Sequence, residues 1–272
     1  LARFRLETSF SSSVISLTEG EVEMADSGRW RLMLGESSQT SGNMAGSKRV
    51  LFVLTSNASM GANGKPTGFW LEEFAAPYYK FVDNGWTVTV VSPAGGAAPC
   101  DPSSMSANDE ASSRYKEDSA AMAVVANTGT ISSVDPADFD ALFYPGGHGP
   151  MWDLVSHDGS IKLIESFVAA DKPLAAVCHG PCVLVKAKTA GGESILQGKA
   201  CTGFSNAEEE AAGLTSVVPF SLEDTMKECG GKYVAHPDGL WKAHVQVDGK
   251  LVTGQNPASS EATADAVLAI CA

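Results

Sequence analysis

Short apolar runs alternate with amphipathic stretches along most of the chain. The apolar runs are rich in Val, Leu, Ala or Phe, and each is bounded by Gly, Pro or Ser. They are RVLFVLTS (49–56), TVTVVSP (87–93), DALFYPGG (140–147) and LAAVCHG (174–180). Continuous apolar runs of this length predict strands that are buried on both faces of a parallel sheet.

Three further stretches, 68–85, 159–172 and 259–272, place apolar residues near helical spacing. The first ends at Gly85, a residue type that suits a helix C-terminus. Residues 244–254 predict a hairpin with Asp-Gly at its tip. The alternation predicts an α/β sandwich around a mostly parallel central sheet, in which ligands bind at the carboxyl ends of the strands.

Residues 1–43 differ from the rest of the chain, because they are Ser-rich, lack a sustained periodicity and do not begin with Met. Met44 stands just before the first predicted strand. We expect residues 1–46 to be a disordered or non-native extension and residues 47–272 to form a single domain. A degenerate targeting segment is the alternative for the extension, although its layout does not match a secretory signal and its acidic residues do not fit a transit peptide.

Composition and charge narrow the classes of function. The 272 residues are 44% hydrophobic and 19% charged, as expected of a globular protein. The net charge of −13 argues against a nucleic-acid partner and against binding to anionic membranes. No apolar run reaches the ~20 residues that span a bilayer. Six cysteines are too few for a disulfide framework in a chain of this length, which favours a reducing, cytoplasmic location. Organelle targeting by the N-terminal segment stays open.

Cys178 is the strongest candidate for a reactive group. It lies in LAAVCHGPCVL (174–184), where a predicted strand gives way to a predicted helix. A tight turn of this kind projects a nucleophile away from the sheet, and a helix N-terminus lowers the pKa of a thiol. Cys182 is separated from Cys178 by three residues rather than the two of a redox pair, and further zinc ligands are not evident at a suitable spacing. We therefore expect Cys182 to be a packing residue and the site to hold no metal.

Two acidic segments offer partners for this cysteine and for His179. In TGFSNAEEE (202–210), one of the three glutamates is a candidate to orient the imidazole as the third member of a triad. The remaining glutamates are expected to form a solvated first helical turn. In TGFWLEE (67–73), a carboxyl kept protonated by burial is a candidate acid or base, and the pattern does not choose between Glu72 and Glu73.

The glycine-rich segment YPGGHGPMWDL (144–154) follows another predicted strand. Gly146 and Gly147 can turn backbone amides toward a cleft, which is what an oxyanion hole requires. The phosphate-loop and GxGxxG spacings are not present in this segment. His148 either closes over a substrate or is a loop histidine held by the backbone.

Together these segments resemble one family. AAVCHGP, PGGHG followed by WDL, TGFWLEE followed by AAPYY, TGFSNAEEE and LVTGQNPAS resemble the PfpI-type branch of the class I glutamine amidotransferase-like superfamily. Within it, the chain is most similar to the glutathione-independent glyoxalase (glyoxalase III) and chaperone subgroup. The resemblance covers residues 47–272 in collinear order, and the five segments together are more specific than any one of them.

The resemblance implies a fold and a set of site residues. The fold would be a flavodoxin-like three-layer sandwich with a nucleophile elbow, and the protein would be a homodimer without a cofactor or a metal. The catalytic residues would be Cys178, His179, Glu73 and Glu209. The oxyanion hole would be formed by the backbone of Gly146, Gly147 and His179, and His148 would lie beside the substrate.

The resemblance also implies an activity. The chain would convert methylglyoxal, a small reactive aldehyde, to lactate through a Cys178 hemithioacetal, with deglycase or chaperone activity alongside. A Cys-His-Glu triad is equally suited to a cysteine hydrolase that cleaves amides or peptides. A holdase chaperone or oxidative-stress sensor, in which Cys178 is oxidised rather than turning over substrate, is the non-enzymatic alternative.

Overall fold

The computed structural model describes residues 21–24, 30–33 and 47–272. Most of the predicted N-terminal extension, residues 1–46, therefore lies outside the described residues. Within it, strands β1 (Glu21–Met24) and β2 (Trp30–Met33) form an antiparallel pair. The chain divides after residue 45 into two units, and the second unit holds the α/β fold and every candidate site residue.

The second unit is built around a seven-stranded sheet with the order β10-β11-β7-β6-β3-β4-β5. All neighbouring pairs are parallel except the β10–β11 hairpin at one edge. A separate parallel pair, β8–β9, lies outside this sheet. The strands are β3 (Arg49–Val53), β4 (Thr87–Ser92), β5 (Gly129–Thr130), β6 (Ala141–Tyr144), β7 (Leu174–Val177), β8 (Ala200–Cys201), β9 (Lys232–Tyr233), β10 (Val245–Asp248) and β11 (Leu251–Gly254).

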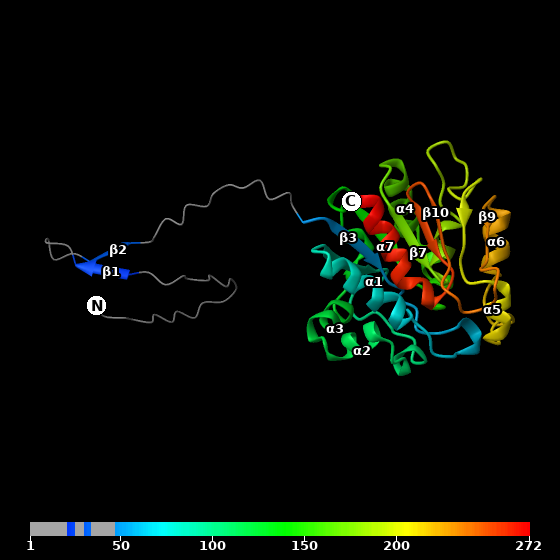
Figure 1. Ribbon diagram of the computed structural model, residues 1–272, viewed down its shortest axis with the longest axis horizontal. Helices are drawn as coiled ribbons and strands as arrows, with labels where there is room; N and C mark the ends of the chain where they lie inside the picture. The colour runs from blue at the N-terminus through cyan, green and yellow to red at the C-terminus, as the bar shows by residue number, and fades with distance from the viewer. Residues whose placement is uncertain (1–20, 25–29, 34–46) are drawn as a thin grey trace. The chain divides into compact units, whose positions relative to one another are not determined.

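Helices cover both faces of this sheet. The connections β3–α1–β4 and β6–α4–β7 run in opposite directions across it, and because such crossovers are right-handed, α1 and α4 lie on opposite faces. Helix α7 packs beside α1 (Figure 1). The helices are α1 (Leu71–Asp83), α2 (Glu110–Glu117), α3 (Ser119–Ala126), α4 (Asp158–Ala169), α5 (Asn206–Ala211), α6 (Leu222–Glu228) and α7 (Ser260–Cys271).

The predicted elements are confirmed with one exception. The four apolar runs contain β3, β4, β6 and β7, the amphipathic stretches contain α1, α4 and α7, and Asp248 and Leu251 close the predicted hairpin. The helix predicted after Cys178 is wrong, since this segment is a five-residue 3-10 helix, η7 (Gly180–Leu184). Its backbone therefore offers less of the aligned dipole that a long α-helix would direct at the thiol.

A cluster of stacked and edge-on aromatic rings fixes α1 to the sheet. Phe52 of β3 stacks on Phe143 of β6 with ring centroids 4.9 Å apart. Phe74 and Phe81 of α1 each meet Phe52 edge-on at 5.8 Å. All four rings are fully buried, and each such pair contributes about 0.5–1.5 kcal/mol beyond its area. This packing sets the position of the first turn of α1, which carries Glu73.

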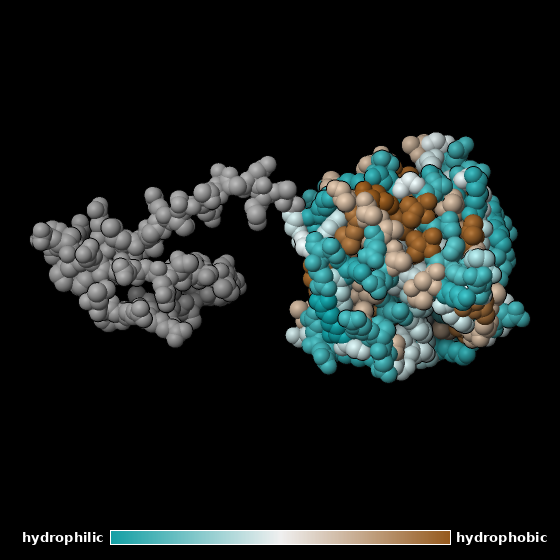
Figure 2. All heavy atoms as spheres, viewed as in Figure 1, coloured by the Kyte–Doolittle hydropathy of each residue, from teal (hydrophilic) through white to brown (hydrophobic). Residues whose placement is uncertain are grey.

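The surface combines hydrophilic and hydrophobic residues. Figure 2 shows hydrophilic residues over much of the visible face, with hydrophobic residues gathered near the C-terminal end of α7. The half-buried Leu268 and Ile270 belong to that part of the helix. Among the described residues, the helices are too short or too polar to cross a membrane.

Candidate active site

Cys178 stands directly after β7 in a left-handed backbone conformation. Its φ is +59°, which is rare for a residue with a side chain, and its N–H donates to the Gly254 carbonyl of β11 at 3.0 Å. Two residues later the turn requires a glycine, because a Cβ on Gly180 would lie 2.5 Å from the Tyr144 carbonyl oxygen. The turn directs the thiol out of the sheet, as the predicted nucleophile elbow requires. The side chain is only 4% exposed.

The same turn brings the neighbouring His179 back against the sulfur. The distance from Cys178 Sγ to His179 Nδ1 is 3.3 Å, and His179 Nε2 lies 2.7 Å from Glu209 Oε2. Glu209 projects from α5, whose first turn is fixed by a capping box between Ser205 and Glu208. Cysteine, imidazole and carboxylate thus form a continuous hydrogen-bonded chain.

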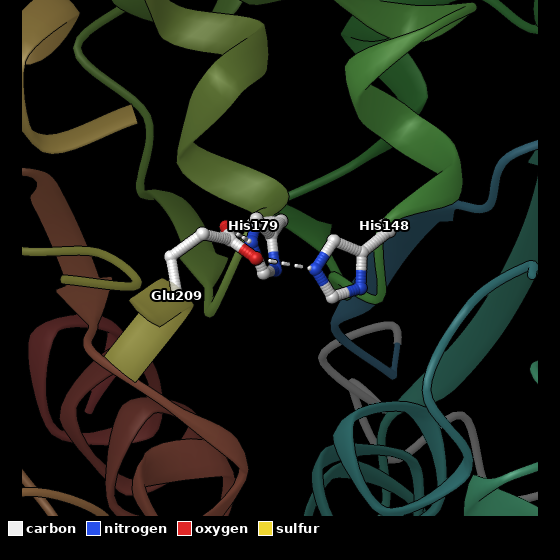
Figure 3. Close-up of side chains that lie close together, drawn as sticks. All are labelled: His148, His179 and Glu209. Carbon is white, nitrogen blue, oxygen red and sulfur yellow. Dashed lines mark hydrogen bonds and ion pairs between the residues drawn. The ribbon is translucent and has the colours of Figure 1, made fainter. Parts of the chain in front are cut away.

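Glu209 also contacts a second imidazole. His148 Nε2 lies 3.0 Å from Glu209 Oε1, and the rings of His148 and His179 are 4.0 Å apart between centroids. Figure 3 shows the carboxylate of Glu209 facing both rings, which come from the segments that follow β6 and β7. All three side chains are buried. Each carboxylate oxygen therefore accepts from one ring, which places a proton on Nε2 of both imidazoles.

Glu73 approaches the sulfur from α1. It is fully buried, and its Oε2 accepts a hydrogen bond from the Gly146 N–H at 2.7 Å. Within the described part of the chain, Oε1 has no N–H or O–H donor, and Cys178 is the side chain that interacts with this carboxyl. Glu72, one residue earlier, is half-buried and is not part of the cavity wall. Glu73 is therefore the carboxyl of this pair that lies at the site.

The two glycines of the PGGHG segment have different roles. The Gly146 N–H is taken by Glu73, so it is not free to bind an oxyanion. The backbone amides of Gly147 and His179 instead interact with Cys178. Gly147 has φ of +80°, and a Cβ there would lie 2.4 Å from the Gly68 carbonyl. These two amides are the donors that an oxyanion next to the sulfur would meet.

Burial decides the protonation of the cysteine and the acid. Desolvation, together with the neighbouring Glu73, raises the pKa of Cys178 well above its usual value. Desolvation also raises the pKa of Glu73 well above its usual value, against hydrogen bonds from Cys178 and Gly146 that lower it. The sequence predicts a lowered cysteine pKa at a helix N-terminus, but the loss of hydration outweighs the two amide hydrogen bonds. The thiol of Cys178 is therefore protonated at neutral pH, and burial favours the protonated form of Glu73.

The pKa values of His179 and Glu209 are both lowered, in contrast to those of Cys178 and Glu73. Burial, with a smaller contribution from His148, lowers the pKa of His179 to about 4 even though Glu209 acts to raise it. Burial alone would raise the pKa of Glu209, but the hydrogen bonds from His148 and His179 outweigh it and lower that pKa to about 2. At neutral pH the site therefore holds a neutral His179 beside an ionised Glu209, which is the arrangement of a general base and its orienting acid.

A cavity of about 230 Å³ opens over these groups. Its wall includes the apolar side chains of Met60, Trp70, Phe204, Leu214 and Trp241. Its polar groups are Glu73, Asp101, Ser103, Gly147, His148, Cys178 and His179. The space accommodates a small molecule whose reactive carbon contacts the sulfur.

Several site features were not evident from the sequence. Glu208 was expected to be solvated unless it was the triad acid, yet it is fully buried and bonds Ser205, Gln255 and Asn256. The exposed Glu210 alone fits the solvated interpretation. The amide pair in LVTGQNPAS is the signal that could have found the buried carboxylate, because adjacent Gln and Asn side chains need acceptors when buried.

The fold also brings together three possible metal ligands that are far apart in the sequence. The sequence predicts no metal, because further zinc ligands are not evident at a suitable spacing around Cys178. The fold instead brings His148, His179 and Glu209 together with ligand atoms within 4.8 Å of one another. Two imidazoles and a carboxylate are a donor set that divalent metals use.

Comparison with known proteins agrees with the geometry. The DJ-1/PfpI family profile matches residues 66–270. The chain is 33% identical over 229 residues to the glutathione-independent glyoxalase HSP31 of Saccharomyces cerevisiae, covering 80% of this chain and 95% of that protein. It is 30% identical over 234 residues to glyoxalase 3 of Candida albicans, covering 81% and 97%.

Solved structures of related proteins share the fold of this chain. The 24 kDa rapid encystment protein of Francisella tularensis matches with a TM-score of 0.78 and 36% identity, covering 82% of this chain and 98% of that one. The crystal structure of glyoxalase III from Candida albicans matches with a TM-score of 0.76 and 28% identity, covering 82% and 97%. The α/β fold with its mostly parallel sheet is thus shared with these proteins, and the chain belongs to the DJ-1/PfpI family.

Proposed function

We propose that this protein is a glutathione-independent glyoxalase that converts methylglyoxal and water to lactate. The observation that carries the proposal is the position of Cys178 Sγ, 3.3 Å from Nδ1 of a neutral His179 and beside the buried carboxyl of Glu73. A base and an acid on two sides of one nucleophile suit a reaction that moves protons around a covalent intermediate. The glyoxalases among the relatives support the same substrate class.

The first step joins the sulfur to the aldehyde carbon. The thiol proton passes to His179 Nδ1 as Sγ attacks, because a buried thiol with a raised pKa needs a base at the moment of reaction. The aldehyde oxygen gains the electron pair of the broken C=O π bond. The amides of Gly147 and His179 are the expected donors to this oxygen, which then takes the proton from His179 to give the hemithioacetal and returns His179 to its neutral form.

The second step is the isomerisation. A base removes the proton from the carbon bonded to sulfur, the electron pair forms a double bond to the adjacent carbon, and the acid protonates the ketone oxygen to give an enediol. The protonated base then returns its proton to the adjacent carbon, while the hydroxyl on the sulfur-bearing carbon loses its proton to the carboxylate of the acid, which gives the thioester of lactate. His179 is neutral in the ligand-free protein and burial favours the protonated form of Glu73, so we assign the base to His179 and the acid to Glu73.

The third step restores the enzyme. Water attacks the thioester carbonyl, the carbon–sulfur bond breaks, and the sulfur regains a proton as lactate leaves. Neutral His179, held by Glu209 at 2.7 Å, is placed to take the proton of the attacking water. His148 lines the same cavity and is the additional polar group that a bound carbonyl or hydroxyl of the substrate would meet.

The hydrolase alternative shares the triad but fits the cavity less well. Cys178 is buried, and the space above it is about 230 Å³ with apolar walls on several sides. A peptide or large amide would need an open groove along the nucleophile, whereas a three-carbon aldehyde does not. A chaperone role or deglycase activity does not depend on this distinction and stays a prediction.

The test compares wild type with Cys178→Ala and Cys182→Ala in a glutathione-free assay of lactate formation from methylglyoxal. Cys182 is a fully buried cysteine four residues away, so its alanine variant controls for the loss of a thiol. We expect lactate from wild type and Cys182→Ala and none from Cys178→Ala. Lactate formation by Cys178→Ala at the wild-type rate would refute the proposal. Peptide and amide substrates in the same preparation test the hydrolase alternative.

Assembly and location are further parts of this proposal. We infer a homodimer and a cytoplasmic location from the family resemblance, and the apolar residues near the end of α7 offer a surface for a second copy. Light scattering coupled to size-exclusion chromatography measures the number of chains in the assembly. A molar mass in solution equal to that of one chain would contradict the homodimer.

A further inference from the structure

We propose that His148, His179 and Glu209 form a binding site for a divalent transition-metal cation of the zinc type, and that the bound cation inhibits the enzyme. The three side chains come from three separate segments, after β6, after β7 and on α5. Their ligand atoms lie within 4.8 Å of one another and are all buried (Figure 3).

The first observation in favour is the unbalanced charge of Glu209. This carboxylate is 7% exposed, and its ion-pair partners among the described residues are the two imidazoles rather than a lysine or an arginine. A buried carboxylate is costly unless a cation or several hydrogen bonds compensate it. A dication between the carboxylate and the rings would supply the positive charge that no described lysine or arginine places there.

The second observation is the spacing of the donors. Glu209 lies 3.0 Å from His148 Nε2 and 2.7 Å from His179 Nε2. Zinc binds imidazole nitrogen and carboxylate oxygen at about 2.0–2.2 Å, so two ligands of one tetrahedral ion are about 3.4 Å apart. Each of these two oxygen–nitrogen pairs therefore needs to separate by less than about 1 Å to admit the ion. Two imidazoles and one carboxylate also leave positions open for water or substrate, as in catalytic zinc sites.

The third observation is access. His148 and His179 both line the cavity of about 230 Å³, so an ion can reach them without unfolding the site. Binding requires each Nε2 to give up its proton, and a neutral ring retains that proton by moving it to Nδ1. No oxidant or reductant takes part in this exchange.

Inhibition follows from the position of that proton. His179 Nδ1 is 3.3 Å from Cys178 Sγ, so in the metal-bound protein it is a donor to sulfur rather than an acceptor. It can no longer take the thiol proton when the sulfur attacks. This part of the inference rests on the proposed function, whereas the binding of the ion does not.

The test is titration of the full chain with Zn²⁺ by isothermal calorimetry in the absence of substrate. We expect one equivalent to bind to wild type, to Cys178→Ala and to His157→Asn, a control that removes a histidine at the start of α4 but keeps a good helix cap. His148→Gln and Glu209→Gln should each weaken binding by at least about 10-fold, since even outer-shell changes cost 10–100-fold.

Three outcomes of the calorimetric titration would overturn the proposal. They are the absence of stoichiometric binding to wild type, unchanged binding in both His148→Gln and Glu209→Gln, and loss of the site in Cys178→Ala, which would place the ion on sulfur. Co²⁺ bound to wild type gives an independent measurement if a variant fails to fold. We expect its visible spectrum without a sulfur-to-metal charge-transfer band, and the presence of that band would refute the site. A lack of glyoxalase activity would leave the binding result intact, so the two proposals fail separately.

Discussion

Glu209 accepts a hydrogen bond from Nε2 of His179 at 2.7 Å, which fixes the tautomer of the ring that faces Cys178. With the proton on Nε2, Nδ1 carries a lone pair and points at the sulfur, 3.3 Å away. The second oxygen of Glu209 receives the same kind of bond from His148. One carboxylate thus sets the tautomer of two rings, and a change at this position alters the chemistry at both.

Glu209→Gln is expected to lower kcat by about 10²–10⁴-fold, the usual contribution of a positioned acid or base. A carboxylate offers an acceptor to each ring, whereas an amide offers one acceptor and one donor. One imidazole must therefore move its proton to Nδ1, and if this ring is His179 it cannot accept the thiol proton. Steady-state kinetics with methylglyoxal measure the effect, and Glu210→Gln, an exposed neighbour, is the control. An unchanged kcat in Glu209→Gln would contradict this role.

The acid limb of the pH profile of kcat/KM is expected near pH 4. His179 must be neutral to act as a base, and burial lowers its pKa to about 4. The rate should therefore be lost as the pH falls through about 4, rather than through the usual imidazole value of about 6.5. Because His148 contributes to the lowering, His148→Gln should move the limb to higher pH.

The same shift affects stability, so folding must be checked in that experiment. Unfolded His179 takes up a proton near pH 6.5 while the folded ring does so near pH 4. The free energy of unfolding therefore falls as the pH drops between these two values. Circular dichroism at each pH separates loss of fold from loss of the base. An acid limb near pH 6.5 in a folded wild-type protein would disprove the assignment.

Sequence patterns were sufficient for the framework of the site. Each candidate in the loops after β6 and β7 follows an apolar run, and parallel strands deliver such residues to one edge of the sheet. The adjacency of Cys178 and His179 also made their cooperation predictable once a tight turn was inferred. Choosing Glu73 and Glu209 among neighbouring glutamates came from the family resemblance.

Long-range contacts explain what the sequence did not predict. His148 and Glu209 are 61 positions apart, and their bond depends on how the loop after β6 faces α5. The raised pKa of Cys178 likewise depends on burial by segments distant in sequence, including the cavity wall formed by Phe204 and Trp241. A local sequence motif can predict that a helix dipole lowers the pKa of a thiol. It cannot predict how strongly burial by distant segments raises that pKa.

Glu73→Gln is expected to remove a pH-dependent loss of stability. The unfolded carboxyl ionises near pH 4.5, whereas burial keeps the folded one protonated to a much higher pH. Between these values wild type loses up to about 1.4 kcal/mol of unfolding free energy per pH unit through this group. The variant cannot ionise, so its stability relative to wild type should rise with pH. Urea unfolding at several pH values measures the difference, and a difference that is constant with pH would contradict a protonated Glu73.

Gly146→Ala is expected to lower both stability and activity. A Cβ at this position would lie 2.5 Å from the Val177 carbonyl, 2.6 Å from Glu73 Oε2 and 2.8 Å from the His179 nitrogen, and two of these atoms belong to the backbone. Overpacking of this kind costs about 1–3 kcal/mol. Relief by movement of Glu73 would disturb the acid beside Cys178, so kcat should fall even in the folded fraction.

Gly191→Ala is the matched control for that substitution. Its Cβ would meet only Thr189 Oγ1, at an ordinary contact distance of 3.6 Å. We expect its unfolding free energy within about 0.5 kcal/mol of wild type and an unchanged kcat. Urea midpoints with unchanged m-values compare the two variants. Equal midpoints and equal rates for Gly146→Ala and Gly191→Ala would show that the backbone around Glu73 yields freely, and the close approach of Gly146 to Glu73 would then not be required for the site.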